Sequence, residues 1–139
     1  MTDADIVWAR MRAVYAGFLD GDPAAVDMLL AQDVTIWDSD EFAMTRGLSA
    51  LGDLRARRPA TGPATVTVAD LEAVDPVVDV WGDTALLRHV VRVYRSDGSE
   101  QVVRNTSVWR RIRGEWVAVH NHEDLAGGGE YPLGRATST

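Results

Sequence analysis

The sequence predicts a single α+β domain in which helices come first and an antiparallel sheet follows. Over residues 3–19, and again in two shorter segments before Pro59, apolar side chains recur at three- and four-residue spacings, which is typical of amphipathic helices. Beyond residue 63, valines fall in short runs separated by closely spaced turns. Such turns indicate antiparallel hairpins, because a parallel crossover needs about a dozen residues or more. Helices and strands segregated along the chain favour a curved sheet that wraps the helices.

The helical part begins with a predicted helix over residues 3–19. Gly21-Asp22-Pro23 ends this helix and starts a short second one, because aspartate is a good N-cap and proline suits the first helical position. Residues 33–38 then switch to β-branched and aromatic side chains, which predicts a strand that enters a loop at Ser39. A third helix is expected after Gly47, ending before Pro59.

The predicted strands beyond residue 63 are separated by four turn signals. These signals are Asp75-Pro76, Gly82-Asp83, Ser96-Asp97-Gly98 and Arg113-Gly114. No internal repeat or linker divides the chain, so residues 1–126 are expected to form one domain. Residues 127–139 begin with three consecutive glycines and end in small polar residues, which predicts a loosely ordered tail.

Composition narrows the classes of function. The chain has 139 residues, 46% of them hydrophobic, which is enough to bury a core without a disulfide. The absence of cysteine excludes disulfides, zinc ribbons and cysteine nucleophiles. A formal net charge of −7 disfavours nucleic acid as a partner. The chain has no apolar run of 18 residues and its amino terminus is acidic, so we expect a cytoplasmic protein that does not bind membranes.

Several motifs carry a resemblance to a known family. They are Phe18-Leu-Asp-Gly-Asp-Pro, Asp33-Val-Thr-Ile-Trp-Asp, Gly47, Asp83-Thr-Ala-Leu and the segment of residues 106–120. Their order resembles the nuclear-transport-factor-2-like superfamily, and within it the SnoaL-like and ketosteroid-isomerase-like proteins. The Gly-x-Trp and His-x-His pattern near the carboxy terminus is also similar to the association domain of calmodulin-dependent kinase. The resemblance implies a cone of about six strands around three helices, a deep pocket, and a homodimer formed through the outer face of the sheet.

Asp38 is the first candidate catalytic residue. It closes the first predicted strand after Trp37, where the resemblance to ketosteroid-isomerase-like proteins implies a proton-shuttling aspartate. An apolar pocket disfavours the charged carboxylate and so prepares it to act as a base. Alternatively, Asp38 caps the turn at Ser39. The resemblance also implies hydroxyl donors for a developing oxyanion, for which Tyr15 and Thr106 are the nearest matches, and Trp37 is expected at the pocket mouth.

Histidines form a second candidate group. His120 and His122 lie two apart on the last predicted strand, so they project from the same face as Trp116. His89 belongs to an apolar row that is expected to face inward. A neutral imidazole on such a face acts as acid, base or hydrogen-bond partner, or it is simply a satisfied core residue.

Two further site residues depend on which strand face lines the cone. If the face that carries Arg104 and Thr106 looks inward, Arg104 holds a substrate carboxylate; otherwise it lies outside or in an ion pair. The His-x-His pair could bind a metal together with His89, Asp38 or Glu123, because imidazole and carboxylate are suitable ligands. Nothing else in the chain has a recognised metal-ligand spacing, so we expect no metal and no cofactor.

Two classes of function remain open. The first is a pocket protein that binds a small apolar organic compound and catalyses proton transfer, of isomerase, cyclase or dehydratase type, on a carbonyl or polyketide-like substrate. Its base is Asp38 or a histidine. The second is a non-catalytic ligand-binding or oligomerisation module similar to the kinase association domain. The oligomeric state and the occupancy of the pocket distinguish the two.

Overall fold

The computed structural model describes residues 1–58 and 66–126 and confirms the predicted fold class. Its helices are α1 (Asp3–Leu19), α2 (Pro23–Asp27) and α3 (Gly47–Arg57). Its strands are β1 (Leu30–Trp37), β2 (Thr45–Arg46), β3 (Val68–Trp81), β4 (Thr84–Arg95), β5 (Glu100–Ile112) and β6 (Glu115–Leu125). The described strands form one sheet with the order β2-β1-β6-β5-β4-β3. The predicted tail, residues 127–139, lies outside the described residues.

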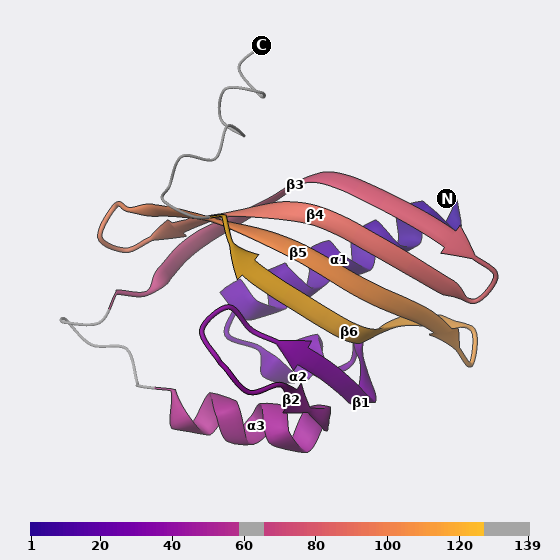
Figure 1. The fold of residues 1–139 in the computed structure, drawn as a ribbon, viewed down its shortest axis with the longest axis horizontal. Coiled ribbons are helices and arrows are strands. Elements are labelled where there is room, and N and C mark those ends of the chain that lie inside the picture. The colour runs from indigo at the N-terminus through magenta and orange to yellow at the C-terminus, as the bar shows by residue number, and fades with distance from the viewer. Residues whose placement is uncertain (59–65, 127–139) are drawn as a thin grey trace, which may run out of the picture.

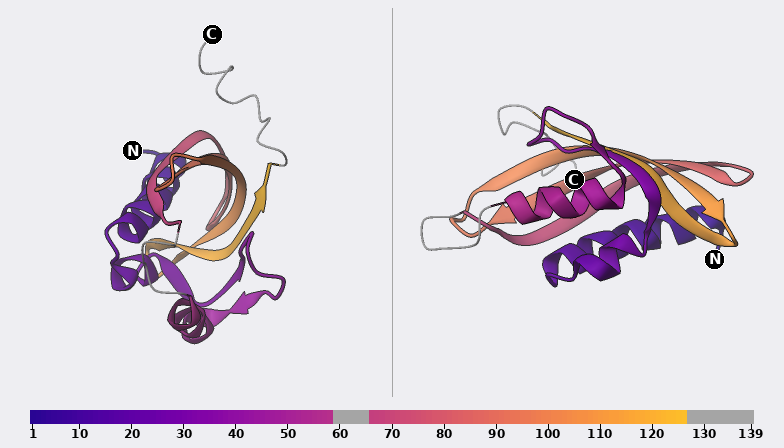
Figure 2. Two further views of the ribbon diagram at one scale, coloured as in Figure 1. Left: turned by 90° about the vertical axis from the view of Figure 1, so that its left-hand side faces the viewer. Right: turned by 90° about the horizontal axis from the view of Figure 1, so that it is seen from below.

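The sheet curls around the helices without closing. In Figure 1, α1 lies along the inner side of β3, β4 and β5, and Figure 2 shows the sheet bending around the helical side of the molecule. The core on this inner side contains Val7 and Met11 of α1, Leu87 of β4, Trp109 of β5 and Trp116 of β6. Within the described ranges, no helix is long and apolar enough to cross a membrane.

One strand pairing differs from the predicted antiparallel sheet. Strands β3 to β6 form an antiparallel meander, but β1 pairs with β6 in parallel, with Thr35 opposite His120. The reason is chain length: α3 and three long strands separate β1 from β6, which is ample for a parallel crossover. The sheet is therefore mixed.

The predicted cap at Asp22 is present, and α1 begins with a capping signal that was not predicted. Thr2 and Asp5 form a capping box at the start of α1, and the Asp22 side chain accepts a hydrogen bond from the Ala25 backbone N at 3.1 Å at the start of α2. Gly21, between the two helices, has a φ of 65°, a conformation that favours glycine.

The predicted turn at Asp75-Pro76 is wrong. Strand β3 continues through these residues with a β-bulge, since its register to β4 shifts between Val74 and Val77 and Asp75 has a φ of 56°. The proline is tolerated because β3 is the last strand of the sheet, so one of its edges needs no hydrogen-bond donors. The other three turn signals separate consecutive strands as predicted.

Candidate functional site

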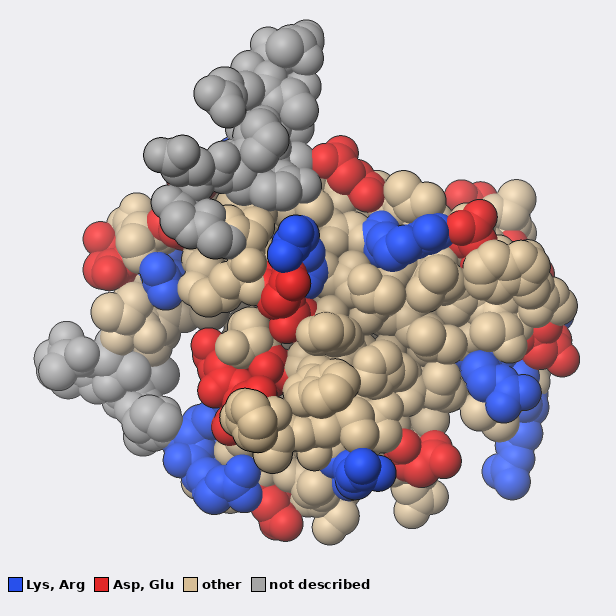
Figure 3. Space-filling model, viewed as in Figure 1, with Lys and Arg blue, Asp and Glu red and all other residues tan. Residues whose placement is uncertain are grey.

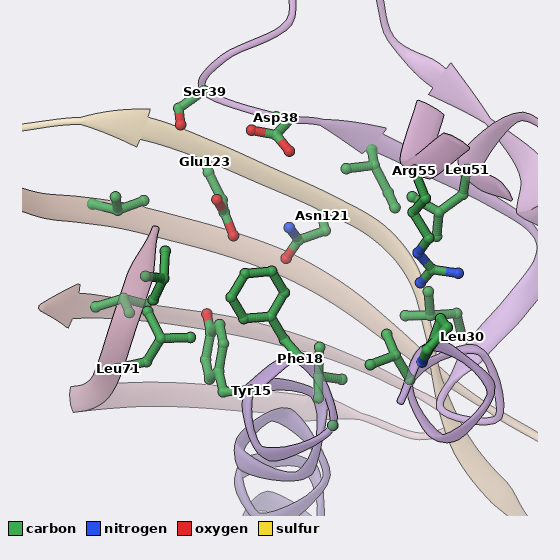
Figure 4. Close-up of a pocket in the computed structure, with 18 of the residues that line it drawn as sticks. Tyr15, Phe18, Leu30, Asp38, Ser39, Leu51, Arg55, Leu71, Asn121 and Glu123 are labelled. Atoms are coloured by element: carbon green, nitrogen blue, oxygen red, sulfur yellow. The ribbon is translucent and has the colours of Figure 1, made fainter. Parts of the chain in front are cut away.

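A cavity of about 510 Å³ lies between the inner face of the sheet and the three helices. We call it the main cavity (Figure 4). Much of its wall is apolar, and Phe18 of α1, Leu51 of α3, Leu71 of β3, Val91 of β4 and Trp109 of β5 all contribute. An apolar enclosure of this size suits a small organic molecule and makes any charged group inside it costly.

Two polar groups point into the main cavity from opposite sides. Figure 4 shows the Tyr15 hydroxyl, on α1, and the Glu123 carboxyl, on β6, directed into the same space. Burial raises the pKa of Glu123 to about 7, and the nearby charge of Asp38 adds to the rise. Hydrogen bonds from Asn121 and Asn105 partly oppose it. Burial, followed by the charge of Glu123, also raises the pKa of Tyr15 well above its ordinary value.

Asp38 lines the main cavity at the end of β1, but its carboxylate is already engaged. Its Oδ2 atom lies 2.6 Å from Nη2 of Arg58, and its Oδ1 atom accepts a hydrogen bond from the Asp40 backbone N at 3.1 Å. The structure thus contains the turn-capping contact that was the alternative to a catalytic role. In Figure 3, acidic side chains over this loop lie next to basic ones at the end of α3.

His89 stands behind the wall of the main cavity and is linked to it through Tyr15. Its Nε2 atom lies 2.7 Å from the Tyr15 hydroxyl oxygen, and its ring packs edge-on against Trp8 and Tyr15. The side chain is only 4% exposed, and burial lowers its pKa to about 4. His89 is therefore a neutral hydrogen-bond partner at neutral pH.

His120 and His122 do not face the main cavity, in contrast to the predicted strand face. Val108 of β5 pairs with His120, but the next residue, Trp109, pairs with Ala118, so Val119 is an extra residue in β6. This β-bulge reverses the alternation of side chains. His120 Nδ1 lies 2.7 Å from Thr35 Oγ1, and the His122 ring packs against that of Trp37.

Arg104 and Thr106 also lie on the outer face and do not line the main cavity, which is the second of the two arrangements that the sequence allowed. Both are exposed, whereas the alternate residues Val103, Asn105 and Ser107 are buried on the inner side. Arg104 forms two hydrogen bonds with the Asp124 carboxylate, at 2.8 Å and 2.9 Å. This is the ion pair that the sequence left open as an alternative.

Trp37 lies outside the main cavity. Its side chain is 43% exposed and borders a second, shallower hollow together with Phe42 and His122. The indole N–H donates to the Phe42 carbonyl oxygen at 3.2 Å, which fixes the ring at the rim of that hollow. Asp38 and Glu123 border both spaces, so Trp37 is close to the site without lining it.

The bulge turns polar residues inward that the sequence did not predict for the cavity: Glu123 was considered only as a metal ligand, and Asn105 and Asn121 were not considered. Asn121 and Glu123 line the main cavity, and Asn105, buried behind them, donates from Nδ2 to Asn121 Oδ1 at 2.9 Å and to Glu123 Oε1 at 3.3 Å. The run Trp116-Val-Ala-Val is apolar on both faces, so alternation gives no sign of the bulge. Within the described parts of the chain, no three His, Cys, Asp or Glu side chains are placed to hold a metal ion.

The curved sheet of six described strands around three helices is an α+β cone, and comparisons with known proteins assign the chain to a family. Residues 11–119 match the family described as SnoaL-like domain. The chain therefore belongs to the SnoaL-like family. No curated protein matches it.

Solved structures agree with this assignment at the level of the fold. An S. rosetta CaMKII hub has a TM-score of 0.72 at 22% identity, covering 91% of this chain and 98% of that one. An NTF2-like protein of unknown function from Pseudomonas putida has a TM-score of 0.73 at 22% identity, covering 94% and 92%. A ketosteroid isomerase-like protein from Erwinia carotovora atroseptica has a TM-score of 0.74 at 15% identity, covering 91% and 98%.

Proposed function

We propose that this protein binds a small apolar carbonyl compound in the main cavity and transfers a proton on it, with Glu123 as the base. The observation that carries the proposal is a carboxyl group, Glu123, that points into an apolar cavity together with the hydroxyl of Tyr15. Because its pKa is about 7, Glu123 is present in both protonation states near neutral pH. A group of this kind can accept a proton and return it in the same turnover.

The chemistry needs only these side chains. Glu123 takes a proton from the carbon next to the substrate carbonyl, and the electrons of the broken C–H bond form an enolate. The Tyr15 hydroxyl donates a hydrogen bond to the enolate oxygen, where negative charge develops. Protonated Glu123 then returns its proton to the same carbon, which gives exchange. Where a substrate double bond is conjugated with the enolate, the proton returns instead to the far carbon of that dienolate and the double bond shifts, which gives isomerisation.

In this proposal Asp38 acts on Glu123 through its charge and is not the base. Its negative charge favours the protonated form of Glu123, and its ion pair with Arg58 makes it a poorer candidate for the base itself. In this proposal the base is therefore Glu123 on β6, and not Asp38, which the sequence suggested. The two carboxyl groups act at one site but carry different roles.

The test measures exchange of the acidic carbon-bound protons of 2-tetralone, a small bicyclic ketone, in D2O by ¹H NMR. We expect the wild-type protein to accelerate exchange and Glu123→Gln to abolish the acceleration. Tyr15→Phe should slow it by roughly 10²–10³-fold, the usual loss for one oxyanion donor. Glu115→Gln, an exposed change on the same strand, is the matched control and should exchange at the wild-type rate. Equal rates for wild type and Glu123→Gln contradict the proposal.

A second, separable property is self-association. The outer face of the sheet carries Val77, 54% exposed, and Trp81, 61% exposed, and one neighbour in fold is a CaMKII hub. Exposed large apolar side chains on one face favour burial against a second copy. We expect light scattering to give twice the monomer mass and Trp81→Arg to shift it toward the monomer. A monomer at all concentrations contradicts self-association and leaves the cavity chemistry unaffected.

A further inference from the structure

Five polar side chains run through the wall of the main cavity from Tyr15 to Glu123. The Tyr15 hydroxyl oxygen lies 2.7 Å from His89 Nε2. At the other end, Asn105 Nδ2 donates to Asn121 Oδ1 at 2.9 Å, and Asn121 in turn hydrogen-bonds to Glu123. Only the contact between His89 and Asn105 is needed to join the two ends.

The two atoms at that position are complementary and unsatisfied. His89 Nδ1 and Asn105 Oδ1 are buried and have no hydrogen-bond partner within the described ranges. His89 and Asn105 are directly opposite each other on β4 and β5, with side chains 4% and 2% exposed. A buried donor or acceptor without a partner costs about 1–3 kcal/mol. We infer a hydrogen bond from His89 Nδ1–H to Asn105 Oδ1, because it would satisfy both atoms.

With Glu123 ionised, this bond completes a chain in which every donor points toward the negative charge. Tyr15 O–H donates to His89 Nε2, and His89 Nδ1–H donates to Asn105 Oδ1. The Asn105 amide donates to Asn121 Oδ1, and the Asn121 amide donates to the Glu123 carboxylate. In this state the Tyr15 hydroxyl donates its hydrogen to His89 Nε2 and cannot donate it to a substrate.

We propose that the direction of this chain reverses when Glu123 takes up a proton, and that His89 and Asn105 are positioning residues for Tyr15. Protonated Glu123 donates to Asn121 Oδ1, and both amides turn, so that Asn105 Nδ2 donates to His89 Nδ1. His89 then carries its hydrogen on Nε2 and donates to the Tyr15 oxygen. Glu123 gains one proton. The imidazole releases the proton on Nδ1 to water and takes one from water at Nε2 when the buried ring opens transiently to solvent, so its number of hydrogens does not change.

The reversal couples the protonation of Glu123 to the hydrogen bonding of the Tyr15 hydroxyl. This inference rests on the proposed function, in which both groups take part. The Tyr15 hydroxyl becomes available to a substrate oxygen when Glu123 holds the substrate's proton, which is when negative charge is on that oxygen. Two charged groups near Glu123, Asp38 and Asp40, raise its pKa and so raise the pH at which the chain reverses. Asp22, Arg55 and Arg58 also line the cavity, and the two arginines are paired with Asp27 and Asp38. None of these groups is a link of the chain.

The test is the tautomer of His89, read from the ¹⁵N chemical shifts of its ring nitrogens between pH 5 and 9. Because the pKa of His89 is about 4, the ring stays neutral over this range. We expect the hydrogen to lie on Nδ1 at high pH and on Nε2 at low pH, with a midpoint near pH 7 that belongs to Glu123. Substitutions of His120 and His122 to Gln assign the signals. A tautomer that does not change with pH overturns the proposal.

Variants test whether the His89 tautomer depends on the protonation of Glu123 or only on the packing around His89. Glu123→Gln cannot titrate, and Asn105→Leu removes the central link, so both should abolish the pH-dependent change of tautomer, while Glu115→Gln should keep it. A change that persists in Glu123→Gln overturns the proposal, and Glu123→Gln decides the matter if Asn105→Leu does not fold. Proton exchange on 2-tetralone is measured independently. If proton exchange on 2-tetralone depends on Glu123 but the His89 tautomer does not change with pH, this inference alone is refuted. If the His89 tautomer changes with pH but the protein does not accelerate exchange, only the proposed function is refuted.

Discussion

Replacing Glu123 by Gln should stabilise the fold at high pH, because the folded protein resists ionising this carboxyl. The pKa of Glu123 is about 7 in the folded chain against an ordinary 4.5, which corresponds to about 3 kcal/mol. Below pH 4.5 both the folded and the unfolded chain are protonated at this position. As the pH rises to 7, the unfolded chain ionises first, so the wild-type free energy of unfolding falls. Above pH 7 the free energy of unfolding is lowered by the full cost of ionising Glu123 in the folded protein.

The assay is urea unfolding followed by tryptophan fluorescence at pH 4.5 and pH 8 for wild type and Glu123→Gln. Gln removes the titration and keeps a side chain that hydrogen-bonds to Asn105 and Asn121. The difference in unfolding free energy between the variant and wild type should rise by about 2–3 kcal/mol from the lower to the higher pH, allowing for partial exposure of the group to the cavity. Glu115→Gln should show no such rise. Parallel pH profiles of wild type and Glu123→Gln would refute the reasoning.

Three further predictions concern neighbouring residues. His89 has a pKa of about 4 in the fold against an ordinary 6.5, so its own contribution to the free energy of unfolding should fall by about 3 kcal/mol as the pH falls from 6.5 to 4, while that of Glu123 rises. The unfolding free energy of His89→Gln relative to wild type should therefore rise by about 3 kcal/mol over this range in the same urea titration, and a constant difference would contradict this. Asp38→Asn removes a charge that raises the pKa of Glu123, so the ¹³C titration midpoint of the Glu123 carboxyl should fall below about 7; an unchanged midpoint would contradict this. At Gly17 a new Cβ would lie 2.9 Å from Val26 Cγ2, so Gly17→Ala should lower stability by about 1–3 kcal/mol in urea unfolding, and a variant as stable as wild type would refute the expected clash.

The sequence predicts the fold well where each element carries its own local signal. Thr2 and Asp22 cap α1 and α2 as their residue types suggest, and glycines with positive φ lie at the hairpins. The parallel pairing of β1 with β6 carries no such signal, because it depends on where distant strands meet. Asp75-Pro76 has the composition of a turn, and only the edge position of β3 makes a bulge acceptable there.

The candidate site was harder to predict because it depends on one extra residue in β6. On an undisturbed strand, Trp116, Ala118, His120 and His122 share a face, and the sequence predicts the two histidines in the cavity. The bulge at Val119 exchanges them for Asn121 and Glu123. The bulge leaves His122 exposed on the outer face and brings a carboxyl with a raised pKa to face the Tyr15 hydroxyl. The register of the backbone thus decides whether imidazoles or a carboxyl lie in the main cavity, and the residue types of β6 alone do not reveal that register.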